Sequence, residues 1–196
     1  WEMIEMEEYL LKNAVNVSHM LLDPFIPRAR VLVDMTCGNG HDTAFLAARM
    51  AQDASLYAFD IQDKAIASTR KRLCDERLLS DRVHLLQGSH DQLLEQIPGV
   101  VDLIVFNLGY LPSGDHSLHT TSEITVKAIK IGLHKIAKNG IIMLAAYPGT
   151  DAGAVEANAV RDYLQTVPQK DYDVSMWQPL NQIHCPPQLY IVQKRG

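Results

Sequence analysis

The feature that most constrains the fold is an alternation of short apolar runs with stretches of helical periodicity along nearly the whole chain. Such an alternation is typical of βαβ units, which form a mostly parallel sheet. Five runs are predicted strands: 30–35, 55–60, 83–87, 100–106 and 140–147. Amphipathic stretches predict helices over 3–22, 42–50, 63–79, 121–138 and 152–164. The sequence therefore predicts a doubly wound α/β fold with a leading N-terminal helix.

Two further apolar runs close the chain, at 172–177 and 188–193. Only the short segment 178–187 joins them, which favours an antiparallel pair. They bring the expected sheet to seven strands. Because 196 residues suit one domain and no linker or repeat interrupts them, we expect residues 1–196 to form a single domain.

A glycine pair follows the first predicted strand, at Gly38 and Gly40. Glycine there lets the backbone turn tightly and lets a ligand approach the main chain. Asp60 ends the second strand 20 residues after Gly40, the spacing at which an acid meets a ribose diol. A dinucleotide site would carry a third glycine where Thr43 stands, and a P-loop would need Gly-Lys-Ser/Thr after the turn. Both alternatives are disfavoured.

Asp34 adds an acid four residues before Gly38. An acid at the entrance of the ligand site beside the glycine loop indicates a ligand that carries a cation as well as a ribose, as S-adenosylmethionine does. The pattern resembles the first motif of class I methyltransferases. The resemblance implies that Asp34 faces the methionine end, that Asp60 binds the ribose hydroxyls, and that the cofactor is bordered by Gly38, Asn39, Gly40, Asp42 and Thr43. The alternative is that Asp34 only caps a strand end.

Other expected cofactor contacts follow the second and third strands. Gln62 is placed to reach the ribose or the adenine, or else it only begins a helix. Ser89 and His90 follow the third strand, where this fold contacts adenine. The alternative for His90 is that it only stands next to the N-cap residue of a short helix.

The fourth strand leads into Asn107-Leu-Gly-Tyr110, in a loop expected over 107–120. Amino-group methyltransferases often hold Asn-Pro-Pro-Tyr here, where the Asn side chain accepts a hydrogen bond from the target amine and the Tyr packs on the substrate ring. Asn107 and Tyr110 keep the two ends, whereas Leu108 and Gly109 replace the prolines. The alternative is that Asn107 merely opens a turn.

Four segments together make the resemblance specific: 34–43, 59–62, 88–90 and 107–115. They are similar to a small bacterial and plant family long labelled putative rRNA methylase. That family methylates the aminomethyl group of 5-aminomethyl-2-thiouridine at the wobble position of tRNA. The resemblance implies a partner in the tRNA anticodon region and a homodimer. The chain departs from the family at Ser113, where glycine is common, and after Tyr147, where the family often has a histidine near the second position.

The implied chemistry needs no metal, because a sulfonium is already a good leaving group. An alkyl amine has a pKa of about 10.4, so only about one in 10³ is uncharged at neutral pH. A base is therefore useful. Asp115 and His116 are the candidates in the loop, and Asp115 belongs to the family pattern, although an Asp after Gly114 also suits a plain turn.

Composition narrows the choice of binding partner and of cellular location. The net charge of −5 disfavours a protein that coats nucleic acid, yet it leaves room for local basic patches at 70–72 and 127–138. The three cysteines fit neither a disulfide framework nor a zinc site, and no apolar run is long enough to span a membrane, so we expect a cytoplasmic protein. His19, His84 and His134 are expected to be structural or at the surface.

The alternative functions are an rRNA or small-molecule methyltransferase and a non-catalytic S-adenosylmethionine-binding module.

Overall fold

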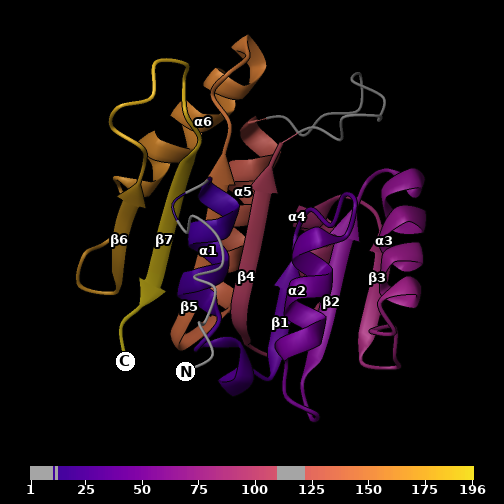
Figure 1. The fold of residues 1–196 in the computed structure, drawn as a ribbon. Helices are drawn as coiled ribbons and strands as arrows, with labels where there is room; N and C mark the ends of the chain where they lie inside the picture. Colours follow the sequence, from indigo (N-terminus) through magenta and orange to yellow (C-terminus); the bar gives the residue numbers. More distant parts are fainter. Residues whose placement is uncertain (1–10, 12, 110–121) are drawn as a thin grey trace, which may run out of the picture.

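A computed structural model describes residues 11, 13–109 and 122–196 and places seven strands in one sheet (Figure 1). The order across the sheet is β3-β2-β1-β4-β5-β7-β6. Only β7 runs against its neighbours, antiparallel to both β5 and β6. The strands are β1 Val31–Asp34, β2 Ser55–Asp60, β3 Val83–Gln87, β4 Val101–Leu108, β5 Ile136–Ala146, β6 Tyr172–Trp177 and β7 Gln188–Lys194. The predicted mostly parallel seven-stranded α/β sheet is confirmed.

The helices lie on both sides of this sheet. They are α1 Ala14–Leu22, α2 His41–Arg49, α3 Asp63–Asp75, α4 His90–Gln96, α5 Ser122–Lys135 and α6 Asp151–Leu164, with a short 3₁₀ helix at Ile26–Arg28. The leading helix is confirmed over α1, while residues 3–10 and 12 of its expected span lie outside the described part of the chain. Within that part, no helix has both the length and the apolar character to cross a bilayer.

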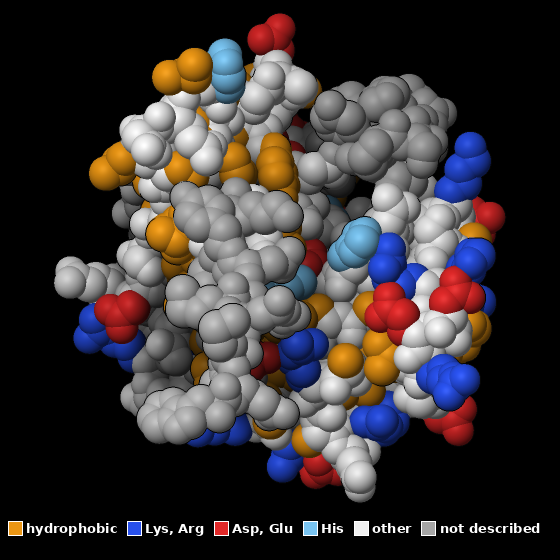
Figure 2. All heavy atoms as spheres, in the orientation of Figure 1, with side chains coloured by type: hydrophobic (Ala, Val, Ile, Leu, Met, Phe, Trp, Pro, Cys, Tyr) orange, Lys and Arg blue, Asp and Glu red, His pale blue; other side chains and the backbone are white. Residues whose placement is uncertain are grey.

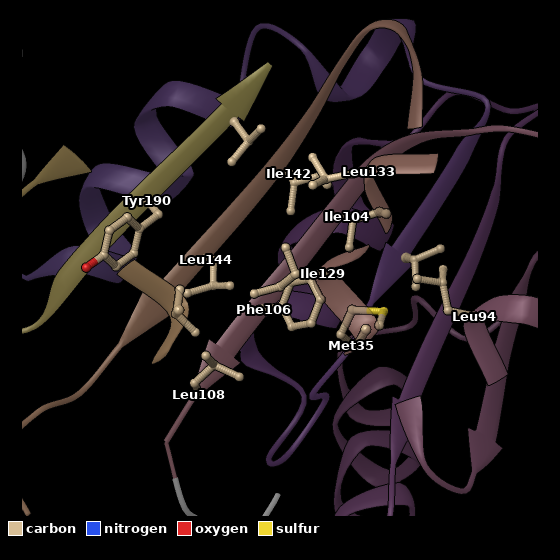
Figure 3. Close-up of a cluster of buried hydrophobic side chains, with 14 of the residues drawn as sticks. Met35, Leu94, Ile104, Phe106, Leu108, Ile129, Leu133, Ile142, Leu144 and Tyr190 are labelled. Atoms are coloured by element: carbon tan, nitrogen blue, oxygen red, sulfur yellow. The ribbon is translucent and has the colours of Figure 1, made fainter. Parts of the chain in front are cut away.

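β4 shows why the central strands are almost wholly apolar. Its side chains alternate between two cores, with Leu103 in the layer under α1 and α2 and Ile104 in the layer under α4, α5 and α6. Phe106 and Leu108 continue the second layer, which Figure 3 shows closing around Met35, Ile129 and Leu144. A parallel strand that is buried on both faces requires apolar residues at consecutive positions.

The connections diverge at β1. From β1 the chain moves outward through β2 to β3, and it then returns to the other side of β1 as β4. The carboxyl ends of β1 and β4 therefore lie at the point where the strand order reverses, which is where doubly wound sheets bind ligands. Asp34 ends β1, Asp60 ends β2 and Asn107 is the last residue but one of β4.

Three predicted boundaries were wrong, each for a local reason. Asn107 lies in β4, not in a loop, because it pairs with Ala145 of β5. The helix expected to reach residue 138 ends at Lys135, because the buried Ile136 already pairs with Val101 as part of β5. The helix expected to reach residue 79 ends at Asp75, just before Arg77 takes a φ of 57°. A left-handed residue of this kind is a common helix end.

The helix α2 begins without a side-chain cap. Gly40 is its N-cap residue, at a φ of 78°, and His41, Asp42 and Thr43 form its first turn. Consequently the Asp42 and Thr43 side chains are engaged elsewhere in the molecule.

Ile104 tests the two-sided core. It is completely buried in the central strand, so we expect Ile104→Ala to lower the free energy of unfolding by about 2–5 kcal/mol, through lost burial and a residual cavity. Val100→Ala, at a residue 59% exposed just before β4, should change it by less than about 0.5 kcal/mol. Urea unfolding followed by circular dichroism measures both, and equal effects would contradict the packing described.

Candidate active site

The side chain of Asp34 is completely buried at the end of β1. Its Oδ2 atom accepts a hydrogen bond of 2.6 Å from the Thr43 hydroxyl, and its Oδ1 atom accepts one of 3.1 Å from the Thr36 amide. Burial, and then the charge of Asp42, raise the pKa of Asp34 to about 7, although the two hydrogen bonds act in the opposite direction. The carboxyl end of β1 therefore holds a buried carboxyl group with a pKa near neutral pH.

The glycine loop is wedged between β1 and α3. A Cβ atom on Gly40 would lie 2.9 Å from the Cα atom of Thr69 in α3, and the positive φ of Gly40 itself disfavours a side chain. The Thr69 hydroxyl donates to the Gly38 carbonyl at 3.1 Å. Glycine at position 40 is thus required by helix packing, independently of any ligand.

Asp60 organises the loop from the end of β2. Its Oδ2 atom accepts from the Gly38 amide and its Oδ1 atom from the Gln62 amide, both at 3.0 Å. Burial raises the pKa of Asp60, and these backbone donors partly oppose the change. The Ile61 backbone also donates to this carboxyl group. Since a carboxylate has about four acceptor sites, one remains available for a hydroxyl donor.

Asn107 joins the end of β4 to the start of α2. Its Nδ2 atom donates to Oδ2 of Asp42 at 3.1 Å, and its backbone amide donates to the Thr36 hydroxyl at 2.8 Å. The other Asp42 oxygen, Oδ1, lies 2.7 Å from Nε2 of His19 in α1. Thr36 and Asp42, from the two ends of the connection between β1 and α2, therefore hold the Asn107 residue.

Tyr147 completes this group directly after β5. Burial and the charge of Asp42 raise its pKa, while a hydrogen bond with the Asn107 side chain lowers it. A Cβ atom on Gly109 would lie 3.6 Å from the Tyr147 ring, so the chain after β4 passes beside this tyrosine. Three adjacent strands thus contribute Asp34, Asn107 and Tyr147 to one edge of the sheet.

Ser89 and His90 follow β3, at the start of α4. The Ser89 hydroxyl donates to Asp91, which also pairs with Lys127 at 2.7 Å. His90 is 6% exposed and lies edge-on to Phe106, with no hydrogen-bond partner for Nε2 among the described residues. Burial lowers the pKa of His90, while the charge of Asp91 and a hydrogen bond with the Met35 backbone oppose this change. The His90 ring therefore lies beneath the end of β1.

The structure gathers most of the residues that the sequence singled out. At the carboxyl ends of β1, β2 and β4 lie Asp34, Gly38, Asn39, Gly40, Asp42, Thr43, Asp60, Gln62 and Asn107. Tyr110, Asp115 and His116 lie outside the described residues. Across the described ranges, no three His, Cys, Asp or Glu side chains gather as metal ligands would.

Sequence reasoning missed four residues of this group. The Thr36 hydroxyl accepts from the Asn107 amide in β4, and the Thr69 hydroxyl donates to the glycine loop. Tyr147 and His19 approach Asp42 from the end of β5 and from α1. Thr36 stands inside the glycine motif and could have been marked there. No local pattern marks the other three, because their partners are distant in the sequence.

Known proteins share this architecture and much of this sequence. The family model described as Putative rRNA methylase matches residues 56–193. A chloroplastic tRNA (mnm(5)s(2)U34)-methyltransferase of Arabidopsis thaliana is 31% identical over 195 residues, which cover 94% of this chain and 71% of that protein.

Two solved structures are also similar. A putative rRNA methylase from Clostridium thermocellum matches with a TM-score of 0.88 and 42% identity, over 93% of this chain and 98% of that one. A putative methyltransferase from Streptococcus mutans in complex with SAH matches with a TM-score of 0.83 and 33% identity, over the same shares of the two chains. The chain therefore belongs to the putative rRNA methylase family, a family of methyltransferases with the class I fold.

Proposed function

We propose that the chain transfers a methyl group from S-adenosylmethionine to the aminomethyl nitrogen of a modified wobble uridine in tRNA. The observation that carries this proposal is the placement of the Asn107 amide, held by Asp42 at the carboxyl end of β4 beside the buried Asp34. The similarity over 94% of the chain to a tRNA (mnm(5)s(2)U34)-methyltransferase supports the choice of acceptor.

The cofactor is proposed to lie along the glycine loop. Asp34 attracts the cationic methionine end, Asp60 accepts from the ribose hydroxyls, and the loop from Gly38 to Gly40 borders both. Asp42, Thr43 and Asn107 line the methionine side, and Gln62, Ser89 and His90 the adenine side. A relative that binds SAH with the same fold supports this arrangement.

The acceptor is proposed to enter between Asn107 and the loop that follows it. Asp115 accepts a proton from the ammonium form of the substrate, and the uncharged amine nitrogen then attacks the methyl carbon. The bond from methyl to sulfur breaks, and S-adenosylhomocysteine leaves with the electron pair. The methylated product keeps its positive charge as a secondary ammonium, while Tyr110 packs on the uridine ring. Alignment of nitrogen, methyl and sulfur supplies most of the rate enhancement, and alignment can contribute roughly 7–11 kcal/mol.

Charge on the surface fits an enzyme that holds one RNA locally. Figure 2 shows Lys and Arg side chains over α2 and α3 with Asp and Glu side chains among them. Lys71 pairs with Asp75 at 2.5 Å and Arg72 with Glu76 at 3.1 Å, so much of this positive charge is neutralised within α3 and its end. Paired charges of this kind weaken the electrostatic attraction on which nonspecific coating of nucleic acid depends.

The pKa of Asp34 predicts how cofactor binding depends on pH. The folded protein keeps Asp34 protonated below about pH 7, and only the ionised form stabilises a cationic ligand. If binding requires that form, affinity for S-adenosylmethionine should rise by roughly 8-fold from about pH 6 to about pH 7.5. The part of the affinity that depends on the Asp34 charge is fully present well above the pKa of Asp34 and is lost as the pH falls through that pKa.

Titration calorimetry at the two pH values measures this change. Asp34→Asn keeps the size and removes the charge, so its weaker binding should not vary over the same range. A wild-type protein that binds equally tightly at both values would remove Asp34 from the proposed role.

Asn107 predicts a separation of binding from turnover. Asn107→Ala should lower kcat by about 100-fold or more, since alignment is lost, and should change the dissociation constant of S-adenosylmethionine by less than about 3-fold. Asn158→Ala, at an exposed amide in α6, is the matched control and should leave both unchanged. Full activity of Asn107→Ala on tRNA would show that the target atom is elsewhere.

The proposed reaction is tested directly with tRNA that carries 5-aminomethyl-2-thiouridine. Incubation with the protein and S-adenosylmethionine, followed by nucleoside mass spectrometry, should show a mass increase of one methyl group at that nucleoside. Methylation of rRNA or of a small molecule, with the wobble uridine unchanged, would replace the proposed acceptor. Binding of S-adenosylmethionine without any transfer would indicate a non-catalytic module.

A further inference from the structure

His19 is held in one orientation by two residues of α2. Its Nε2 atom lies 2.7 Å from Oδ1 of Asp42. Its ring stacks on Phe45, with 3.7 Å between ring centroids and 4° between ring planes. The His19 side chain is 25% exposed and that of Asp42 only 11%, so the contact lies largely out of solvent. Stacking sets the plane of the ring, and the hydrogen bond sets the direction of Nε2.

Asp42 stands between His19 and Asn107. One carboxylate oxygen faces Nε2 of His19 and the other accepts from Nδ2 of Asn107. Because carboxylate oxygens only accept, Nε2 of His19 carries the hydrogen in this contact. The reversed Asn107 amide would place two oxygens face to face, so Asp42 also determines which end of the amide turns away from it. That end is Oδ1.

We infer that His19 is a positioning residue that acts through Asp42 to present Oδ1 of Asn107 to the acceptor amine. This inference rests on the proposed function for the identity of the acceptor. An amine N–H group donates to an oxygen and leaves the nitrogen lone pair free to attack, whereas an NH₂ group would donate to that lone pair and block it. Without His19, Asp42 loses its donor on Oδ1 and is free to turn. The Asn107 amide then keeps only Tyr147 of its two side-chain partners described above, and its orientation is no longer fixed by a carboxylate.

Two variants separate the hydrogen bond from the stacking. His19→Phe keeps an aromatic ring on Phe45 and removes the donor to Asp42. His19→Gln keeps an N–H donor of similar reach and removes the ring. His134→Phe, at an exposed position in α5, controls for the substitution itself. If His19 only supports packing, His19→Phe is the milder change, and if it positions Asn107, His19→Gln is the milder one.

The first measurement needs no substrate. The side-chain amide signals of Asn107 in ¹⁵N-labelled protein, assigned by their loss in Asn107→Ala, report the hydrogen bond to Asp42. We expect them to shift in His19→Phe and to stay near their wild-type positions in His19→Gln and His134→Phe. Unchanged Asn107 signals in His19→Phe would overturn the inference, whatever reaction the protein catalyses.

The second measurement is turnover on tRNA that carries 5-aminomethyl-2-thiouridine. We expect kcat to fall by about 10- to 100-fold in His19→Phe, with KM for S-adenosylmethionine within about 2-fold, and to recover in His19→Gln. Equal loss in both variants, or loss in His19→Gln alone, would assign His19 to packing and overturn the inference. A wild-type protein that is inactive on this tRNA would contradict the proposed function, and the Asn107 signals would still decide the role of His19.

Discussion

The hydrogen bonds around the buried carboxyl group of Asp34 hold the ends of the central elements together. Thr43 ties this group to α2, and Thr36, whose amide donates to the same group, accepts from the backbone of Asn107 in β4. A buried carboxyl group without such partners would be strongly unfavourable. The carboxyl edge of the sheet is therefore a connected polar layer on an otherwise apolar core.

That polar layer depends on the layers beneath it. β1 and β4 are packed on both faces, with Leu32 and Leu103 in one core and Val33 and Ile104 in the other. Close packing on both sides leaves the strand ends little freedom to move. The groups proposed to bind the cofactor and the acceptor are thus carried by strands packed on both faces, an arrangement that suits catalysis by alignment.

The same layer shows why side chains outside the recognised motifs belong to the site. Asp42 was expected to border the cofactor, and its two oxygens in fact connect α1 to β4 through His19 and Asn107. Tyr147 approaches from β5. The candidate site therefore includes the hydrogen-bond partners of the residues near the glycine loop, because each buried polar group needs a partner of its own.

The sequence alone determined the α/β class, the seven strands, and the positions of Asp34, Gly38, Asp60 and Asn107 at or near strand ends, because apolar periodicity and turn residues are local signals. It misplaced the start of β5 and the end of β4, where ladder pairing of Ile136 and Asn107 outweighed local preference. Only the tertiary structure decided that His19 meets Asp42 across 23 positions and that Asp42 meets Asn107 across 65. Such pairs depend on which helix covers which face of the sheet, and no local pattern in the chain records that.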